Sequence, residues 1–138
     1  MTDLEGLCIR DYRIQKKLGM GAMGAVYRVC RLSDDAVFAM KLMSWEMSAD
    51  AHMVERFRME SEVLSRIRHP NLVRIFDYGQ LTDGRFYYIM EHLEGETLAA
   101  RMHRKDLTLG EILHFLRQLC MALDAIHRQG VVHRDLKP

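Results

Sequence analysis

Three segments near the start of the chain show the alternation of apolar and polar positions that is typical of β-strands. They are Tyr12–Leu18, Ala25–Cys30 and Ala36–Met43. A glycine cluster separates the first two segments, and the turn-forming residues 33–35 (Ser-Asp-Asp) precede the third. The pattern therefore predicts three short antiparallel strands joined by tight turns.

The spacing of apolar residues changes to a helical period between Asp50 and Arg68. The apolar side chains that fall on one face of this helix are Met53, Phe57, Leu64 and Ile67. Glu60 fills the gap in that face, so a carboxylate stands where a hydrophobic side chain is expected. We expect the helix to end before Pro70, because the residue that precedes a proline is disfavoured in the helical conformation.

Two more strand-like segments follow this helix. They are Leu72–Gly79 and Arg85–Glu91, and the Asp-Gly pair at positions 83–84 is a strong hairpin signal between them. The sequence therefore predicts five strands in all.

The remainder of the chain has a helical pattern. Thr97–Arg104 predicts a short helix, whose basic residues we interpret as a solvated face. Thr108 begins a longer helix, because Glu111 three residues later completes a capping box, and Gly130 ends it. The apolar positions of this longer helix are Ile112, Leu116, Leu119, Leu123 and Ile126.

Composition narrows the classes of protein. The 138 residues are 49% hydrophobic and 28% charged, as in a soluble globular domain, and 20 Lys and Arg against 19 Asp and Glu leave a net charge of +1. This balance argues against nucleic acid as a partner. Cys8, Cys30 and Cys120 are odd in number and widely spaced, so we expect no disulfide framework, three buried thiols and a cytoplasmic location. No apolar segment is long enough for a signal peptide or a membrane span.

Residues 19–24 read Gly-Met-Gly-Ala-Met-Gly, a spacing with several possible meanings. A dinucleotide-binding fingerprint would open a helix, whereas Gly24 runs directly into the strand-like Ala25–Cys30. A Walker A loop would need Gly-Lys-Ser/Thr, which is absent. The remaining interpretations are a plain glycine hairpin and a hairpin whose bare backbone covers a phosphate chain.

Lys41 is the second candidate residue. In a strand, Val37, Ala39 and Lys41 share one face, so an ammonium lies beside two apolar side chains and needs an anion. Glu60 on the apolar face of the following helix has the complementary requirement, unless it is an ordinary surface glutamate. We expect Lys41 and Glu60 to form an ion pair.

The order and spacing of four motifs resemble the eukaryotic-type protein kinases. The motifs are Gly19-x-Gly21-x-x-Gly24-x-Val26, Ala39-Met40-Lys41, Glu60, and His-Arg-Asp-Leu-Lys-Pro at residues 133–138. The lysine two residues after Asp135 is similar to the serine/threonine branch, and residues 56–60 and 88–98 look most like its bacterial members. The resemblance covers Tyr12–Pro138.

The resemblance implies an α+β fold. Residues 1–11 would be an N-terminal extension, and residues 12–90 an N-lobe with a five-stranded antiparallel sheet and one helix. Residues 91–95 would form the hinge. Residues 96–138 would be the first helices of a helical C-lobe, truncated in the catalytic loop.

The resemblance also implies ATP and Mg²⁺ as cofactors and assigns a nucleotide site. Gly19, Gly21 and Gly24 would cover the phosphates, and Lys41, fixed by Glu60, would hold the α- and β-phosphates. Residues of three kinds would surround the adenine. These are the sandwiching side chains Leu18, Val26 and Ala39, the gatekeeper Met90, and the hinge backbone of Glu91 and Leu93.

The family's catalytic roles fall near the end of the sequence. Asp135 would accept the proton of the substrate hydroxyl, and Lys137 would neutralise the transferring charge. The magnesium-binding Asn and Asp-Phe-Gly of the family pattern come after Pro138, so no metal ligand is assigned within these residues.

The implied function is ATP-dependent phosphoryl transfer to Ser and Thr hydroxyls of protein substrates by a parent kinase. This chain would be the N-terminal half of the kinase domain and inactive by itself. The alternative is a pseudokinase-like module that binds nucleotide or a partner without turnover. A dinucleotide-dependent oxidoreductase is disfavoured by the strand after Gly24.

Overall fold

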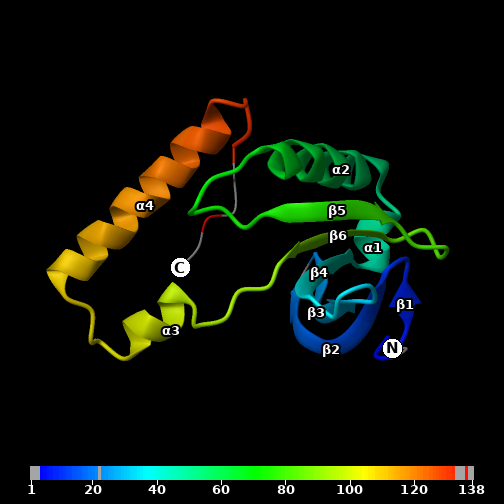
Figure 1. The fold of residues 1–138 in the computed structure, drawn as a ribbon. Coiled ribbons are helices and arrows are strands. Elements are labelled where there is room, and N and C mark those ends of the chain that lie inside the picture. Colours follow the sequence, from blue (N-terminus) through cyan, green and yellow to red (C-terminus); the bar gives the residue numbers. More distant parts are fainter. Residues whose placement is uncertain (1–3, 22, 133–135, 137–138) are drawn as a thin grey trace. The chain divides into compact units, whose positions relative to one another are not determined.

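The computed structural model describes residues 4–21, 23–132 and 136, and for Glu60 only the backbone (Figure 1). The chain divides into two compact units. The first contains Met1–Arg66 and Arg74–His92, and the second contains Ile67–Val73 and Leu93–Pro138. Each unit is described by itself.

The first unit is built on a six-stranded sheet with the order β1-β2-β3-β4-β6-β5 and antiparallel pairing throughout. The strands are β1 (Cys8–Ile9), β2 (Tyr12–Gly21), β3 (Gly24–Arg31), β4 (Val37–Met43), β5 (Ile75–Gln80) and β6 (Phe86–Glu91). The five predicted strands are confirmed. The sixth, β1, pairs with β2 at the sheet edge, and Leu4 packs into the core, so residues 4–11 are part of this unit.

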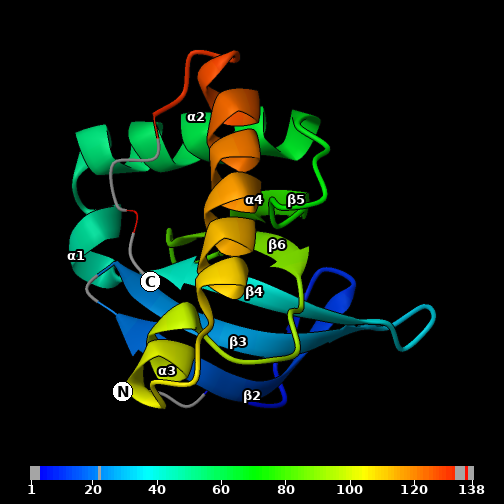
Figure 2. The same cartoon turned by 90° about the vertical axis from the view of Figure 1, so that its left-hand side faces the viewer.

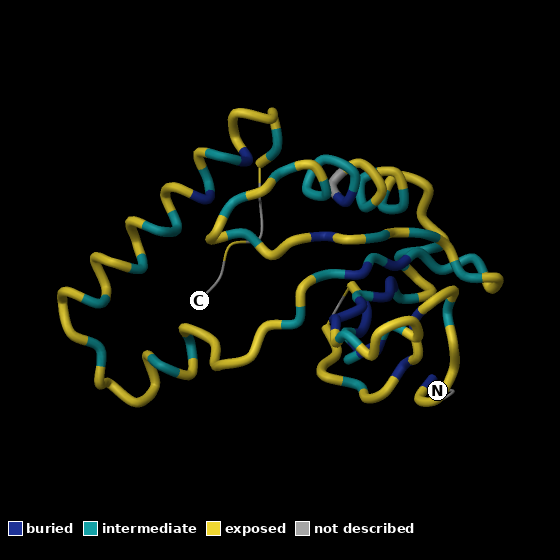
Figure 3. Tube along the Cα trace, in the orientation of Figure 1, coloured by how far each residue is buried: buried dark blue, intermediate teal, exposed yellow. Residues whose placement is uncertain are grey.

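Strand β4 shows how the sequence separates the two faces of the sheet. Phe38, Met40 and Leu42 belong to the buried core, and the residues between them face the other way, as the period of two requires. The core also contains Val29, Tyr87 and Ile89, all fully buried, and the darkest segments of Figure 3 follow these strands. Figure 2 shows the twist of β2, β3 and β4 that curls the sheet around its core.

Two helices complete the first unit. Helix α1 (Trp45–Ser48) begins at Ser44, whose Oγ accepts a hydrogen bond from the N–H of Met47. Helix α2 (Ala51–Arg66) begins after Asp50, whose carboxylate accepts hydrogen bonds from the N–H groups of His52 and Met53. It ends before His69-Pro70, as predicted, and runs along β5 (Figure 1).

The second unit contains α3 (Leu98–His103) and α4 (Leu109–His127), both at the predicted positions. The predicted capping box is present: the N–H of Glu111 donates to Thr108 Oγ1 at 3.2 Å, and the N–H of Thr108 donates to the Glu111 carboxylate at 2.8 Å. At the other end Gly130 has φ +75°, and the N–H groups of Gly130 and Val131 donate to the carbonyls of His127 and Ile126. This pair of bonds is a Schellman motif, so the sequence signals fixed both ends of the helix.

Within the described ranges, no helix is both long enough and apolar enough to span a bilayer.

Candidate functional site

A row of directly opposed residues crosses one face of the first unit's sheet. Gly19 of β2 is the partner of Val26 in β3, Val26 is the partner of Lys41 in β4, and Lys41 is the partner of Tyr88 in β6. Directly opposed residues of an antiparallel pair project from the same face. The pairing therefore places Lys41 between an apolar side chain and an aromatic ring, two strands away from the first glycine of the hairpin.

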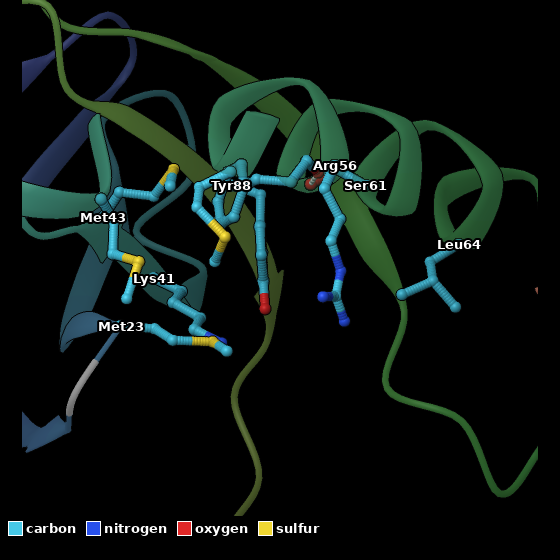
Figure 4. Close-up of a pocket in the computed structure, with 10 residues that line it drawn as sticks. Met23, Lys41, Met43, Arg56, Ser61, Leu64 and Tyr88 are labelled. Atoms are coloured by element: carbon cyan, nitrogen blue, oxygen red, sulfur yellow. Dashed lines mark hydrogen bonds between the residues drawn. The ribbon is translucent and has the colours of Figure 1, made fainter. Parts of the chain in front are cut away.

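Lys41 lines a pocket of about 80 Å³ between the sheet and helices α1 and α2 (Figure 4). The walls are largely apolar, because Phe57 and four methionines contribute to them: Met23, Met43, Met47 and Met53. In Figure 4 Met23 lies alongside Lys41, while Tyr88 and Arg56 extend in a common direction. The pocket thus combines a soft apolar lining with two cationic side chains, a chemistry suited to an anionic group attached to an apolar one.

The three glycines of the hairpin differ in what surrounds their backbone. At Gly19 and Gly21 a Cβ would meet nothing within 4 Å, so the backbone there borders open space that a ligand could enter. At Gly24 the φ is +141°, and a Cβ would lie 2.0 Å from the carbonyl oxygen of Leu42. Gly24 is therefore required by the close approach of β3 to β4. Packing does not require glycine at positions 19 and 21, where the bare backbone is available to a ligand.

The tip of the hairpin is held to the start of α1. The N–H of Ser44 donates a hydrogen bond to the carbonyl of Met23 at 3.0 Å. Since Ser44 also caps α1, one residue connects the glycine hairpin to the first helix.

The residues expected around an adenine occupy the first unit except for one. Leu18 is 46% exposed at an irregularity in the β2–β3 pairing, where one extra residue turns the side chain away from regular alternation. Ala39 is buried and is the cross-strand partner of Met90. The N–H of Glu91 donates to the carbonyl of Arg74 at 2.9 Å. Leu93, which is exposed, belongs to the second unit.

The structure describes only some of the predicted catalytic residues. Asp135, Lys137 and the side chain of Glu60 lie outside the described residues, so the Lys41–Glu60 pair stays a prediction. Among the carboxylates that the structure describes, none is within ion-pair distance of Lys41. Its Nζ lies 5.9 Å from the centroid of the Tyr88 ring, within the range of a cation–π contact.

Two aromatic residues of the site were missed by the sequence reasoning. The rings of Tyr88 and Phe57 stack, with centroids 5.1 Å apart and planes inclined by 28°. Phe57 was expected on the apolar face of its helix, but its contact with Tyr88 was not expected. That contact depends on the register of β4 with β6, which places Tyr88 beside Lys41. The sequence offered one signal, since alternation in residues 86–90 places Tyr88 on the same strand face as Met90.

Two basic residues of helix α3 and its C-cap, Arg101 and Arg104, form ion pairs. Arg101 contacts Asp106 at 3.0 Å and Glu111 at 2.8 Å, and Arg104 contacts Glu96 and Asp106. Hydrogen bonds from Arg104 hold the pKa of Glu96 below its usual range, and those from Arg101 and Arg104 lower the pKa of Asp106. The charges of Arg101 and Arg104 are therefore balanced by neighbouring carboxylates among the described side chains.

The three cysteines are free. Cys30 is buried as expected, but the expectation is wrong for Cys8 and Cys120, which are exposed. Cys8 lies in the short edge strand β1, and Cys120 lies on α4, where most side chains reach solvent.

Comparison with known proteins bears on the same residues. The model of the protein kinase domain family matches residues 12–138. The serine/threonine-protein kinase pkn3 of Myxococcus xanthus is 37% identical over 128 residues, which are 92% of this chain and 23% of that protein. PknE of Mycobacterium tuberculosis is 36% identical over 135 residues, 97% of this chain and 24% of that kinase.

Solved structures give the same result. A crystal structure of the PknI kinase domain of Mycobacterium tuberculosis superimposes with a TM-score of 0.87 at 31% identity, over 99% of this chain and 56% of that one. The chain thus spans less than a quarter of these two curated relatives and little more than half of the solved domain. With a match over nearly all of its length, the chain belongs to the protein kinase domain family, and the two curated relatives named above are bacterial serine/threonine kinases.

Proposed function

We propose that the protein carrying this chain transfers the γ-phosphoryl group of ATP to Ser and Thr hydroxyls of other proteins, and that this chain supplies the nucleotide-binding half of the site. The observation that carries the proposal is the row Gly19–Val26–Lys41, in which a strand lysine lies beside an apolar residue whose other cross-strand partner is a glycine. We place the reaction in the cytoplasm, since three free cysteines suit a reducing compartment.

The described residues fit a nucleotide. A triphosphate needs positive charge and close backbone approach, which Lys41 and the open backbone at Gly19 and Gly21 offer. A purine base needs flat apolar surface, which Val26 and Ala39 offer on neighbouring strands. ATP supplies the phosphoryl group, and Mg²⁺ supplies the charge that neutralises it in transfer.

In this proposal each group of the chain has one task. Lys41 binds the α- and β-phosphates, and the carboxylate of Glu60 orients Lys41. Leu18 and Met90 border the base, and the backbone of Glu91 and Leu93 hydrogen-bonds it.

The reaction itself is assigned to the motif at residues 133–138. Asp135 accepts the proton of the substrate hydroxyl, and Lys137 balances charge on the moving group. The family's metal-binding residues follow position 138 in the pattern, so we propose that these 138 residues bind nucleotide without transferring the phosphoryl group.

The first test is nucleotide binding. Titration calorimetry with ATP should give an affinity that falls at least tenfold in Lys41→Met, because the phosphates lose their cation. Lys16→Met, which removes an exposed lysine of strand β2, two strands away from Lys41, is the matched control and should bind as the unmodified protein does. Equal affinities of the unmodified protein and Lys41→Met would refute the role of Lys41.

The second test is turnover. The full-length protein that carries this chain should transfer labelled phosphate from ATP to casein, and Asp135→Asn should abolish the transfer while ATP binding remains. Binding without transfer in the unmodified protein would instead support the module without turnover.

A further inference from the structure

We propose that Tyr88 is a positioning residue for Lys41, and that it connects Lys41 to helix α2 through Phe57. This inference rests on the proposed function, because the task being positioned is the binding of phosphates by Lys41. It adds an aromatic route to the expected carboxylate of Glu60.

The first step of the argument is the register of the sheet. Lys41 and Tyr88 are direct partners on the adjacent strands β4 and β6, so the stem of the lysine and the ring project side by side. The ammonium lies 5.9 Å from the ring centroid. An aromatic face attracts a cation at this range, and a flat ring also limits the rotamers open to a lysine stem. An aliphatic residue at position 88 would offer neither effect.

The second step is the contact with the helix. Phe57 of α2 stacks on Tyr88 with ring centroids 5.1 Å apart. Phe57 also lines the same pocket as Tyr88 and Lys41, and the latter two are labelled in Figure 4. A displacement of α2 therefore moves Phe57, changes the packing of Tyr88, and alters the support under Lys41.

The third step concerns the neighbourhood of the ring. Four methionines share this pocket. Methionine side chains are flexible and adapt to gaps, so they hold a neighbour in place less firmly than rings do. The stacked pair is thus the rigid part of an otherwise adaptable lining, and its Tyr88 ring lies within cation–π range of the lysine.

The chain offers a matched control. Tyr78 of β5 is the cross-strand partner of Tyr88 on its other side, so Tyr78→Leu removes the same ring from the same sheet one strand further from Lys41. Tyr88→Phe keeps the ring and is the conservative variant.

The experiment measures ATP affinity of the full-length protein by calorimetry, carried to millimolar nucleotide so that weakened binding is still measured. We expect Tyr88→Leu to weaken binding about three- to tenfold, the size of a partly desolvated cation–π contact. Phe57→Leu should weaken it less, and Tyr88→Phe and Tyr78→Leu should bind as the unmodified protein does. Thermal melts of every variant confirm that each is folded.

A double-mutant cycle separates positioning from general packing. If Tyr88 acts through Lys41, adding Tyr88→Leu to Lys41→Met causes no further loss of affinity. A loss in that background equal to the loss in the unmodified protein would overturn the inference while leaving the role of Lys41 intact. An unmodified protein that binds no ATP would overturn the proposed function and this inference together, and an unfolded Tyr88→Leu leaves Phe57→Leu to decide by the same cycle.

Discussion

The two units of this chain differ in how they use their apolar side chains. In the first unit Val29, Met40 and Ile89 are fully buried between curled strands. In the second, Leu109 is 71% exposed and Leu113 is 58% exposed on helix α4, and within the described part of that helix Ala122 and Ile126 are the buried residues. Both units nevertheless have well-capped elements, so capping alone does not distinguish them.

The difference shows which interactions determine the structure of each unit. The ends of α4 are set by hydrogen bonds among residues close in sequence, which need no surrounding core. The row that includes Lys41 depends on residues far apart in sequence, and a packed core must hold their register. The phosphate-binding part of the proposed site, Lys41 with Gly19 and Gly21, accordingly lies on the unit with the core.

The largest test of this comparison is a pair of leucine truncations. Leu42→Ala removes a side chain that is 1% exposed, and we expect it to lower the free energy of unfolding by about 2–5 kcal/mol through the cavity left behind. Leu113→Ala makes the same chemical change on exposed α4 and should alter it by no more than about 0.5 kcal/mol. Urea denaturation followed by circular dichroism measures both. Similar losses in the two variants would contradict the contrast between the units.

A second pair of substitutions separates folding from binding within the glycine hairpin. Gly24→Ala introduces a Cβ at φ +141° and against the Leu42 carbonyl, and the backbone conformation alone should cost about 1–3 kcal/mol. Gly19→Ala meets no atom, so it should leave the melting temperature unchanged and weaken only the binding of ATP. A stable Gly24→Ala protein would show that β3 and β4 need not approach so closely.

A smaller effect is expected at the capping box of the second unit. Thr108→Ala removes the Oγ1 that accepts from the N–H of Glu111, and such a change typically costs about 1 kcal/mol of helix stability. Amide hydrogen exchange in the first turn of α4 should accelerate, while the amides of β4 should not change. Thr108→Ser keeps the cap and is the control.

The smallest expected effect is a loss of stability of the second unit at acidic pH. The pKa values of Glu96, Asp106 and Glu111 are lowered. For Glu96 and Asp106 the largest cause is a hydrogen bond from an arginine side chain, and for Glu111 it is the hydrogen bond from the backbone N–H of Thr108. Lowered folded-state values mean that the stabilisation is complete above the unfolded-state pKa, about 4.3 for Glu. It is lost as pH falls through the folded values.

Carboxyl carbon NMR measures these titrations directly. Arg104→Met should raise the pKa of Glu96 toward its ordinary value, because its largest cause is the hydrogen bond from Arg104. An unchanged titration of Glu96 in that variant would contradict the assignment.

Much of the fold could be predicted from the sequence because its signals are local. The five strands followed from alternation, and the ends of α4 followed from Thr108, Glu111 and Gly130. The edge strand β1 was not predicted, because two residues are too few for a period.

The candidate site was predictable in its residue types and less so in its contacts. Lys41 was identified by its face, but its contact with Tyr88 depends on the pairing of strands separated by helix α2. The pairing irregularity beside Leu18 was not predicted, because it is a property of two strands together. Similarly, the exposure of Cys120 depends on what surrounds α4, which no local pattern encodes.

The hydrogen bond from the Ser44 N–H to the Met23 carbonyl has a practical consequence. Each time the glycine hairpin lifts, this amide must lose its acceptor, so its proton becomes free to exchange with solvent. The exchange rate of one backbone proton, on a residue outside the hairpin, therefore reports how often the hairpin opens. A nucleotide held beneath it should slow that proton first.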